Sequence, residues 1–472
     1  MIRCLVCDLG AGSGRVMLAT HDGDRLDLVE IHRFDGYAVE RSDGPHWNVA
    51  TLLAGVDEGL RRARVVGGPV DSIGVDSWGL DYALFTAEGT LVGEPHHYRH
   101  ARSARGFRLF PGGAADLFAT TGAQDLPVNT LFQLHDEARH HPERHRGATR
   151  LLMMADVVNH HLTGMFRSEV TLARTSGLLE AATDAWSRVL CDRAGIPFGL
   201  LQPTIRAGER YGTLRPGLAE PLGWGPVPVM AVAAHDTASA VAALRLEDGS
   251  GFLICGSWLL FGVEQEGINT CDAVRRAGFG NEGGVQGRTF LVKSLDGLHL
   301  IRKLRTSWRG RYGEDLSFAE ISRRAAEARP APGARVIDPA DPLFFDPPDM
   351  IAALGKAFAQ RGEPAPVEVG GLALTVYAGL AAKVAAAVQD LEAVLGRTLP
   401  ALTLCGGGAQ DPLLRSLVAE ATGKPLRLGP VEASAWGNAM MQLRGLGVVK
   451  SLDEGRRLIE RSRGIQDPSP DP

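Results

Sequence analysis

The segment that most constrains the fold is the glycine-rich stretch CDLGAGSGRVML at residues 7–18. Glycine loops bind phosphate in three settings: the dinucleotide fingerprint, the P-loop, and a hairpin turn that wraps the phosphates of a nucleotide. The fingerprint requires a third glycine where this chain has Arg15, and the P-loop requires a Gly-Lys-Ser/Thr triplet that the segment does not contain. Of these three phosphate-binding motifs, the sequence is therefore compatible only with the hairpin turn.

The residues after the loop, RVMLATHDGDRLDLVEIHRF, support a hairpin. Apolar residues alternate with small or polar ones on both sides of the HDGD turn, and a period of two predicts antiparallel strands rather than a helix. Asp8 indicates a cation, because a carboxylate repels phosphate unless a cation such as Mg²⁺ lies between them. A plain glycine hairpin with a structural aspartate remains the alternative.

Composition sets the class of protein. The 472 residues suffice for two or more domains, and a net charge of -5 without long runs of like charge gives no general attraction to nucleic acid. We find no stretch of about 18 apolar residues without a charge and no signal peptide, so we expect a soluble cytoplasmic protein that binds neither membrane nor nucleic acid. The six cysteines lack the spacing of a zinc site, and we expect free thiols in core strands.

The order of predicted elements indicates two similar halves, each opening with an antiparallel meander and continuing with alternating helices and strands. A duplicated α/β fold follows, with a nucleotide in the cleft between its halves. The predicted elements are a helix at 47–64, a strand, turn and hairpin at 70–92, mainly helix at 129–163, a strand, corner and helix at 227–246, a strand–turn–strand at 249–265, a surface loop at 328–336, a long helix at 369–396, a strand, glycine turn and helix at 401–423, and a disordered tail at 467–472.

Seven segments together resemble the FGGY family of sugar kinases, and the similarity runs from about residue 2 to about residue 443. The resemblance implies a two-domain, duplicated actin/hexokinase/Hsp70-like (ribonuclease H-like) ATPase fold with an interdomain cleft. It places an N-terminal domain at residues 1–243, a C-terminal nucleotide domain at 244–445, and a C-terminal helix with a disordered tail at 446–472. The segments are DLGAGSGRVMLA, GVDSWGLDY, LPVNTLFQL, VAAHDTASAV, NEGGVQGR, CGGGAQDPLL and GPVEASAWGN.

The resemblance implies that ATP and Mg²⁺ bind at the glycine corners. The opening turn would hold the ATP phosphates through backbone N–H groups and two side chains, and Asp8 would orient hydrated Mg²⁺. Small glycines would let the third corner approach the adenosine. The implied nucleotide-binding residues are Ala11, Gly12, Ser13, Gly14 and Arg15 in the opening turn, Ser257 in the second corner, Gly406, Gly407 and Gly408 in the third, and Arg302.

The resemblance makes Asp236 the expected catalytic base, and its place where a predicted strand ends and a helix begins would let it reach into a cleft. The spelling HDTASA also allows a helix N-cap at this aspartate. His235 and Thr237 would bind sugar hydroxyls, and the backbone of Gly79 would press against the sugar. Asp76 and Asp81 are expected to be structural or supporting groups.

The implied reaction transfers the γ-phosphate of ATP to the C1 hydroxyl of a ketose, with L-rhamnulose expected ahead of L-fuculose, L-ribulose, D-xylulose or another small polyol. The chain departs from the pattern of kinases for that sugar near the expected pocket. His100 replaces an acid, Ala155 replaces a proline, Ser294 replaces an asparagine presumed to contact the sugar, and Arg302 replaces a glutamine on the nucleotide side.

Two other classes of protein share this fold. An ATP-driven chaperone or filament protein is disfavoured, because no peptide-binding β-domain or filament insert is apparent in the sequence. A non-catalytic sugar sensor would be signalled by loss of Asp236, which this chain retains. The expected partner is a small-molecule sugar, and the chain is expected to be a monomer or homodimer.

Overall fold

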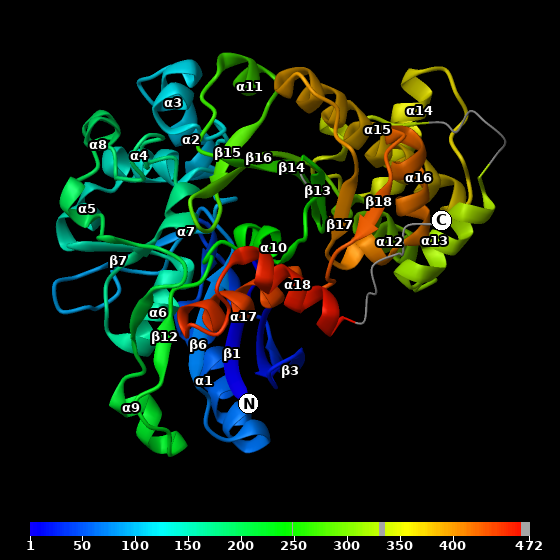
Figure 1. Ribbon diagram of the computed structural model, residues 1–472. Coiled ribbons are helices and arrows are strands. Elements are labelled where there is room, and N and C mark those ends of the chain that lie inside the picture. The colour runs from blue at the N-terminus through cyan, green and yellow to red at the C-terminus, as the bar shows by residue number, and fades with distance from the viewer. Residues whose placement is uncertain (248, 330–335, 464–472) are drawn as a thin grey trace. The chain divides into compact units, whose positions relative to one another are not determined.

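The computed structural model describes residues 1–247, 249–329 and 336–463. They form two compact units (Figure 1). The first unit comprises Met1–Arg245, Gln265–Leu291 and the described residues from Ala433 onward, and the second comprises Leu246–Glu264 and Val292–Glu432.

The first unit is built on a six-stranded sheet with the order β11-β12-β6-β1-β2-β3. Strands β12, β6 and β1 are parallel, whereas β2 and β3 continue as the antiparallel meander that the alternating sequence predicts. The six strands are β1 (Ile2–Leu9), β2 (Gly14–His21), β3 (Leu26–Phe34), β6 (Ser72–Ser77), β11 (Arg210–Thr213) and β12 (Pro228–Met230).

Three two-stranded sheets and a set of helices complete the first unit. The small sheets pair β4 (Ala38–Arg41) with β5 (Gly44–Trp47), β7 (Tyr82–Phe85) with β8 (Arg150–Met153), and β9 (Ser168–Glu169) with β10 (Thr204–Ile205). The helices are α1 (Val49–Gly67), α2 (Ala101–Leu109), α3 (Ala114–Thr121), α4 (Thr130–His140), α5 (Pro142–Gly147), α6 (Met154–Thr163), α7 (Val170–Arg174), α8 (Arg188–Ala194), α9 (Pro216–Ala219), α10 (Asp236–Ala243), α11 (Asp272–Arg276), α17 (Ala433–Gly445) and α18 (Leu452–Ser462), with 3₁₀ turns η1 (Phe198–Leu200) and η2 (Glu220–Leu222).

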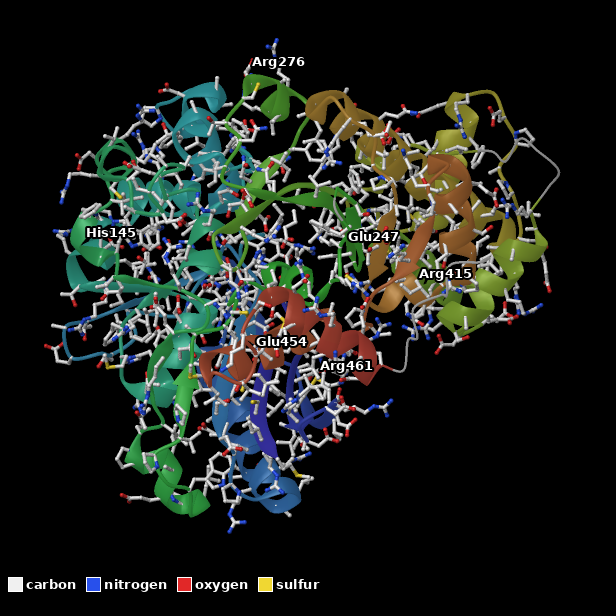
Figure 2. All side chains as sticks on the ribbon, viewed as in Figure 1. His145, Glu247, Arg276, Arg415, Glu454 and Arg461 are labelled. Carbon is white, nitrogen blue, oxygen red and sulfur yellow. The ribbon has the colours of Figure 1, made fainter. Side chains whose placement is uncertain are left out.

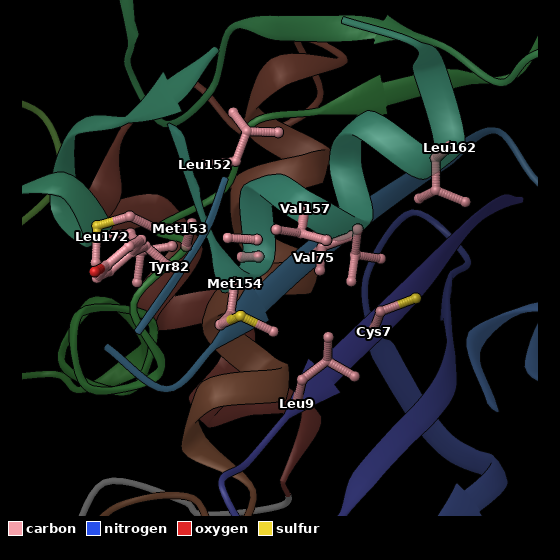
Figure 3. Close-up of a cluster of buried hydrophobic side chains, with 14 of the residues drawn as sticks. Cys7, Leu9, Val75, Tyr82, Leu152, Met153, Met154, Val157, Leu162 and Leu172 are labelled. Carbon is pink, nitrogen blue, oxygen red and sulfur yellow. The ribbon is translucent and has the colours of Figure 1, made fainter. Parts of the chain in front are cut away.

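Strand β1 is buried on both faces of the first sheet, and its successive side chains point to opposite faces. Leu5, Cys7 and Leu9 of β1 belong to one core cluster with buried residues of α1 and α6 (Figure 3). Cys4 and Val6 belong to a second cluster, with apolar residues of α17 and α18. The continuous apolar run at the start of the chain is thus explained by a strand covered on both sides.

The second unit carries a six-stranded sheet with the order β15-β16-β14-β13-β17-β18, whose far strands β15 and part of β16 come from first-unit residues. Its strands are β13 (Gly251–Cys255), β14 (Trp258–Glu266), β15 (Gly280–Gly283), β16 (Arg288–Asp296), β17 (Leu402–Cys405) and β18 (Leu426–Leu428). Its helices are α12 (His299–Tyr312), α13 (Phe318–Glu327), α14 (Met350–Gln360), α15 (Val369–Leu395) and α16 (Pro412–Thr422), with 3₁₀ turns η3 (Pro342–Phe344) and η4 (Gly407–Gln410).

The two large sheets repeat one pattern, which confirms the predicted duplication. In each sheet three parallel strands are followed by an antiparallel neighbour: β12, β6 and β1 precede β2, and β18, β17 and β13 precede β14. Each hairpin, β1–β2 and β13–β14, carries at its turn one of the corners that the sequence singled out.

Two sequence-based expectations need correction. The hairpin predicted within 70–92 is limited to a single bridge between Phe85 and Leu91, and β7 pairs with β8 from a distant part of the chain. The segment 129–163 is mainly helical, as predicted, and also contains β8. Of the six free cysteines, Cys191 lies on helix α8 and Cys271 is exposed before α11, so not all of them occupy core strands.

Helix α15 has the length and apolar composition of a membrane-spanning helix, although the sequence predicted none. In its most apolar 18-residue window, 72% of the residues are buried inside the protein. Such burial is that of the core helix of a soluble protein, whose apolar residues face protein on all sides.

Two predicted segments fall outside the described residues, wholly or in large part. They are the disordered tail at 467–472 and most of the surface loop at 328–336.

Gly437 lets helices α10 and α17 cross closely. A Cβ atom built at Gly437 would lie 1.8 Å from the carbonyl oxygen of Ser239 on α10. We therefore expect Gly437→Ala to lower the free energy of unfolding by about 1–3 kcal/mol, the usual range for overpacking, because the backbones must separate. Urea unfolding followed by tryptophan fluorescence measures the change.

The matched control is Gly355→Ala on helix α14, where a Cβ would meet no atom within 4 Å. Alanine should stabilise that helix by up to about 1 kcal/mol because it restricts the unfolded chain. Equal effects of the two substitutions would contradict the close-crossing argument.

Candidate active site

Three carboxylates converge at one edge of the first unit's large sheet. Asp8 at the end of β1 is paired in register with Asp76 on the parallel strand β6. Beyond β12 the chain turns, the N–H of Ser77 donates to the carbonyl of Ala234 at 2.8 Å, and α10 begins at Asp236. Because parallel strands end at the same edge, the fold brings together residues more than two hundred positions apart.

Asp8 and Asp76 are both buried and are held by neighbouring side chains. An oxygen of Asp8 accepts from Arg15 at 2.5 Å and from the Ser434 hydroxyl at 3.0 Å. Asp76 accepts from the Asn438 amide at 2.6 Å, and its Oδ1 has no hydrogen-bond partner among the described residues. Burial, and then the charge of Asp8, raises the pKa of Asp76 well above its usual value.

The geometry of Asp236 is not that of a helix N-cap. An N-cap side chain accepts from the backbone N–H two or three residues later. Asp236 instead accepts from the adjacent residue Thr237, at 2.6 Å from its N–H and 3.2 Å from its hydroxyl, and His235 occupies the cap position. About a third of the Asp236 side chain, 36%, is accessible. Burial raises the pKa of Asp236, His235 lowers it, and Asp8 raises it.

His235 lies between two acidic side chains. Its Nδ1 is 3.1 Å from Oε2 of Glu282 on β15, and its Nε2 is 3.4 Å from Oδ1 of Asp236. Burial alone would lower the pKa of His235, but the charges of Glu282 and Asp236 raise it above its usual value. The imidazole therefore lies between two carboxylates that raise its pKa.

The buried Glu169 fixes the corner before α10, a role that sequence reasoning missed. Its Oε2 accepts from the N–H groups of Ala234 at 3.1 Å and of Thr171 at 2.9 Å. The Thr171 hydroxyl in turn accepts from the N–H of His235 at 3.3 Å. Burial raises the pKa of Glu169 to about 7. Glu169 caps α7 through its bonds to Thr171 and Leu172, and its contact with Ala234 could not be seen in the sequence because Ala234 is distant along the chain.

The corner that follows β6 has an unusual backbone. Leu80 has φ of +79°, a left-handed conformation that costs a leucine about 1–3 kcal/mol. Its N–H donates to Thr175 Oγ1 at 3.1 Å, and its carbonyl accepts from Thr130 Oγ1 at 2.6 Å. A Cβ at the preceding Gly79 would lie 3.0 Å from the Thr175 hydroxyl, so close packing of this corner requires glycine.

An aromatic cluster supports that corner. The indole N–H groups of Trp47 and Trp78 both donate to Asp81, at 2.7 and 2.9 Å. Tyr37 stacks on Trp78 and donates its hydroxyl to the carbonyl of Gly10. The cluster therefore connects the opening glycine turn to the β6 corner, and Asp81 has the structural role expected for it.

The opening turn is closed by a hydrogen bond from the N–H of Gly10 to the carbonyl of Ser13, at 3.0 Å. Gly12 is exposed, and Ala11 and Ser13 are partly exposed. Gly14 serves packing, since a Cβ there would lie 2.6 Å from the ring of Phe34.

The second unit brings together the other corners singled out by the sequence. Ser257 lies in the turn between β13 and β14, where its carbonyl accepts from the N–H of His299 at 3.2 Å. Gly406 has φ of +83°, and a Cβ there would lie 2.9 Å from the carbonyl oxygen of Cys255. A Cβ at Gly408 would lie 3.0 Å from that same carbonyl oxygen. The glycines therefore allow the third corner to approach the second.

The structure groups the predicted residues by unit. Those assigned to the sugar, the metal and the opening turn lie in the first unit, except for Ser294, which is exposed on β16 in the second. The second unit also holds Arg302, exposed on α12, together with Ser257 and Gly406, Gly407 and Gly408.

Two positions at which the chain departs from the family pattern, His100 and Ala155, lie in the first unit. His100 caps α2, where its Nδ1 accepts from the N–H of Arg102 at 3.2 Å, and its ring lies against those of His46 and His96. Asp156, beside Ala155, is buried and accepts from the N–H of Glu169 at 3.1 Å.

The sheet pattern and the corners define a two-domain sugar-kinase fold, and comparison with known proteins agrees. The chain belongs to the FGGY family of carbohydrate kinases: the N-terminal domain of that family matches residues 4–243 and the C-terminal domain matches residues 251–446. It is therefore an ATP-dependent carbohydrate kinase, as the sequence motifs predicted.

Similar curated proteins cover nearly the whole chain. A rhamnulokinase of Bacteroides thetaiotaomicron is 32% identical over 458 residues, which is 96% of this chain and 93% of that protein. A rhamnulokinase of Klebsiella pneumoniae is 36% identical over an alignment of 476 positions, which covers 99% of this chain and 95% of that protein.

Solved structures share the fold at low sequence identity. A ligand-bound xylulose kinase from Lactobacillus acidophilus has a TM-score of 0.80 at 14% identity, covering 97% of this chain and 92% of that one. The ADP complex of a glycerol kinase from Plasmodium falciparum has a TM-score of 0.76 at 13% identity, with the same coverage of 97% and 92%.

Asp81 makes stability depend on pH. Burial raises its pKa to about 7, so between about pH 4 and pH 7 the folded protein holds a proton that the unfolded chain has released. Stability from this group therefore falls as pH rises, by up to about 1.4 kcal/mol per pH unit. We expect the urea midpoint of Asp81→Asn to rise relative to that of the wild type as the pH increases from 4 to 7.

Asp192→Asn, at an exposed aspartate on α8, is the control, and its urea midpoints should follow the wild type across the same range. A constant difference between Asp81→Asn and the wild type at every pH would show that Asp81 does not carry the buried proton.

Proposed function

We propose that the protein is a kinase of L-rhamnulose, which transfers the γ-phosphate of ATP to the C1 hydroxyl to give L-rhamnulose 1-phosphate in the cytoplasmic breakdown of L-rhamnose. The observation that carries the chemistry is the accessible carboxylate of Asp236, held at the first turn of α10 between His235 and Thr237. The observation that carries the sugar is the similarity to rhamnulokinases over nearly the full chain.

Asp236 is proposed as the general base. In phosphoryl transfer a carboxylate accepts the proton of the attacking hydroxyl and aims that oxygen at the γ-phosphorus. The bonds from Thr237 engage Oδ1, so Oδ2 is the oxygen proposed to face the sugar hydroxyl. The raised pKa of Asp236 favours this role, because it brings the carboxylate closer to a neutral operating pH.

His235, Thr237 and the backbone of Gly79 are proposed to bind the sugar. Glu282 orients the imidazole of His235 through its Nδ1. Glu169 accepts a hydrogen bond from the N–H of Ala234, the residue before His235. This bond holds His235 and Asp236 together at one corner. The Thr175 and Thr130 hydroxyls fix the β6 corner at Leu80, which places the Gly79 backbone.

The carboxylates of the first unit fit a divalent cation. Asp8 and Asp76 lie opposite one another on adjacent strands, and the unpartnered Oδ1 of Asp76 is an orphaned acceptor in a buried site. Mg²⁺ prefers carboxylate oxygens and water, and would neutralise negative charge on the ATP phosphates. We propose that Asp8 orients this hydrated ion, with Asp76 supporting it.

The ATP phosphates are proposed to bind at the opening turn, through the backbone of Ala11, Gly12 and Gly14 and the side chains of Ser13 and Arg15. The exposure of Gly12 leaves backbone free to approach a ligand. The second unit would supply Ser257 to the γ-phosphate, and Gly406, Gly407, Gly408 and Arg302 to the nucleoside. We propose domains at 1–243 and 244–445 with a C-terminal segment at 446–472, in a chain proposed to act as a monomer or homodimer.

Asp236→Asn tests the base. The amide keeps the size of the side chain but cannot accept a proton, so kcat with L-rhamnulose should fall by about 10²–10⁴-fold while Mg²⁺–ATP affinity changes little. Steady-state ADP release measures kcat, and calorimetry measures nucleotide binding.

Asp192→Asn on α8 is again the matched control and should keep wild-type kcat. If Asp236→Asn retains kcat within about threefold of the wild type, Asp236 is not the base. Absence of Mg²⁺–ATP binding by the wild-type protein would reject the kinase reading of the cation and phosphate sites.

The sugar is tested by kcat/KM for L-rhamnulose, L-fuculose, L-ribulose and D-xylulose. L-rhamnulose should exceed the other three sugars, and Ser294→Asn should raise its kcat/KM by about 2–10-fold, since a recovered hydrogen bond contributes about 0.5–1.5 kcal/mol. A tenfold preference for another of the four sugars would replace the named substrate and leave the phosphoryl-transfer chemistry intact.

A further inference from the structure

A cluster of metal-binding side chains lies apart from the three carboxylates. Asp43, His46 and His96 each offer a ligand atom, and the three atoms lie within 4.8 Å of one another. All three residues belong to the first unit, in and beside the β4–β5 hairpin. None of them has a part in the kinase chemistry proposed above.

Backbone hydrogen bonds fix the two histidines side by side. The N–H of Trp47 donates to the carbonyl of Pro95 at 2.8 Å, and the N–H of His97 donates to the carbonyl of Pro45 at 3.0 Å. These bonds make His46 and His96 direct antiparallel partners, with ring centroids 4.4 Å apart. Both rings are more than nine-tenths buried, so their positions are set by the fold.

The ring nitrogens are oriented as ligands. Nδ1 of His46 lies 3.0 Å from the carbonyl of Gly44, so it carries the proton and leaves a lone pair on Nε2. Nε2 of His46 and Nε2 of His96 lie 3.7 and 3.8 Å from the same carboxylate oxygen, Oδ2 of Asp43. Nδ1 of His96 is buried and has no hydrogen-bond partner among the described residues. Metal bonds of about 2.0–2.2 Å from each atom would span such separations.

The charges around the cluster permit a cation. The positive charges that act on His96 are those of Arg102 and Arg144. Both arginines are engaged elsewhere, with Nη1 of Arg102 2.7 Å and Nε of Arg144 3.4 Å from Oε2 of Glu137. The Asp43 side chain is 60% exposed and brings a negative charge.

The cluster opens into a cavity of about 420 Å³. Helix α5, which carries the labelled His145 in Figure 2, contributes Glu143 and Arg144 to the cavity wall, and Glu94 also lines the cavity. Arg41 pairs with Glu94 at 2.8 Å, and Oε1 of Glu143 lies 3.3 Å from Nδ1 of His141. The cavity leaves room for water to complete a coordination sphere.

We propose that Asp43, His46 and His96 bind one transition-metal dication of the zinc class, with water or Glu143 in the remaining position. Two imidazoles and one carboxylate suit Zn²⁺, whereas Mg²⁺ prefers oxygen ligands alone. The ion would clamp the β4–β5 hairpin to the segment before α2. It would thereby stabilise Trp47, the neighbour of His46, which donates to Asp81 in the aromatic cluster.

The experiment uses the full chain without a histidine tag, stripped of metal and kept in excess Mg²⁺ to occupy oxygen-ligand sites. Zn²⁺ is titrated by calorimetry, and Co²⁺ is titrated by its visible absorption. We expect one equivalent to bind and the thermal midpoint of unfolding to rise. Asp43→Asn and His96→Gln should each weaken the affinity at least about tenfold, since loss of even a supporting residue typically costs 10–100-fold.

Asp43→Asn is the decisive variant because its side chain is exposed and its loss does not empty the core. Asp192→Asn, at another exposed aspartate, is the matched control and should bind Zn²⁺ as the wild type does. The proposal is overturned if the wild type binds no stoichiometric Zn²⁺, or if Asp43→Asn binds it with unchanged affinity. Loss of binding in Asp8→Asn instead would place the ion at the carboxylates near β1.

Discussion

The arrangement of the first unit depends on the gathering of three carboxylates, Asp8, Asp76 and Asp236, at one sheet edge. Like charges in a buried site raise one another's pKa and oppose folding unless hydrogen bonds or a cation compensate. Arg15 and Ser434 compensate Asp8, Asn438 compensates Asp76, and Thr237 compensates Asp236. The negative charge that these hydrogen bonds do not compensate is available to the cation and the sugar hydroxyl that we propose to bind here.

Helix α17 from the far end of the chain makes this compensation possible. Its residue Asn438 reaches Asp76, and Gln442 accepts from the Ser72 hydroxyl at 2.7 Å and donates to the carbonyl of Leu5 at 3.0 Å. The same helix needs Gly437 to cross α10 closely enough. One C-terminal helix thus covers the sheet, satisfies its buried polar groups and aligns the helix that carries Asp236.

The hairpin reading of the opening turn and the placement of Asp236 at a strand-to-helix corner could be obtained from local sequence, because both rest on neighbouring residues. The period-two alternation after Arg15 and the apolar run before HDTASA each indicate a strand directly.

Other predictions failed where the interacting residues were distant along the chain. The sequence of β7 predicts one strand of a local hairpin, but β7 pairs with β8. The fold decides the pairing by the strand that it places beside β7. The contacts of Glu169 with Ala234 and of Thr175 with Leu80 could not be seen in the sequence, because these partners lie far along the chain.

The sequence by itself determined the duplicated α/β architecture, the glycine turn between β1 and β2, the presence of Asp8 and Asp236, and the membership of the sugar-kinase family. These features follow from the order of the residues, from the period-two alternation of the strands and from the glycines at the turns. Tertiary structure alone decided which groups support Asp236 and that His46, His96 and Asp43 meet at one point. The physical reason is that side-chain convergence depends on strand order and helix crossing, which are set by the packing of the whole unit and not by any local stretch of chain.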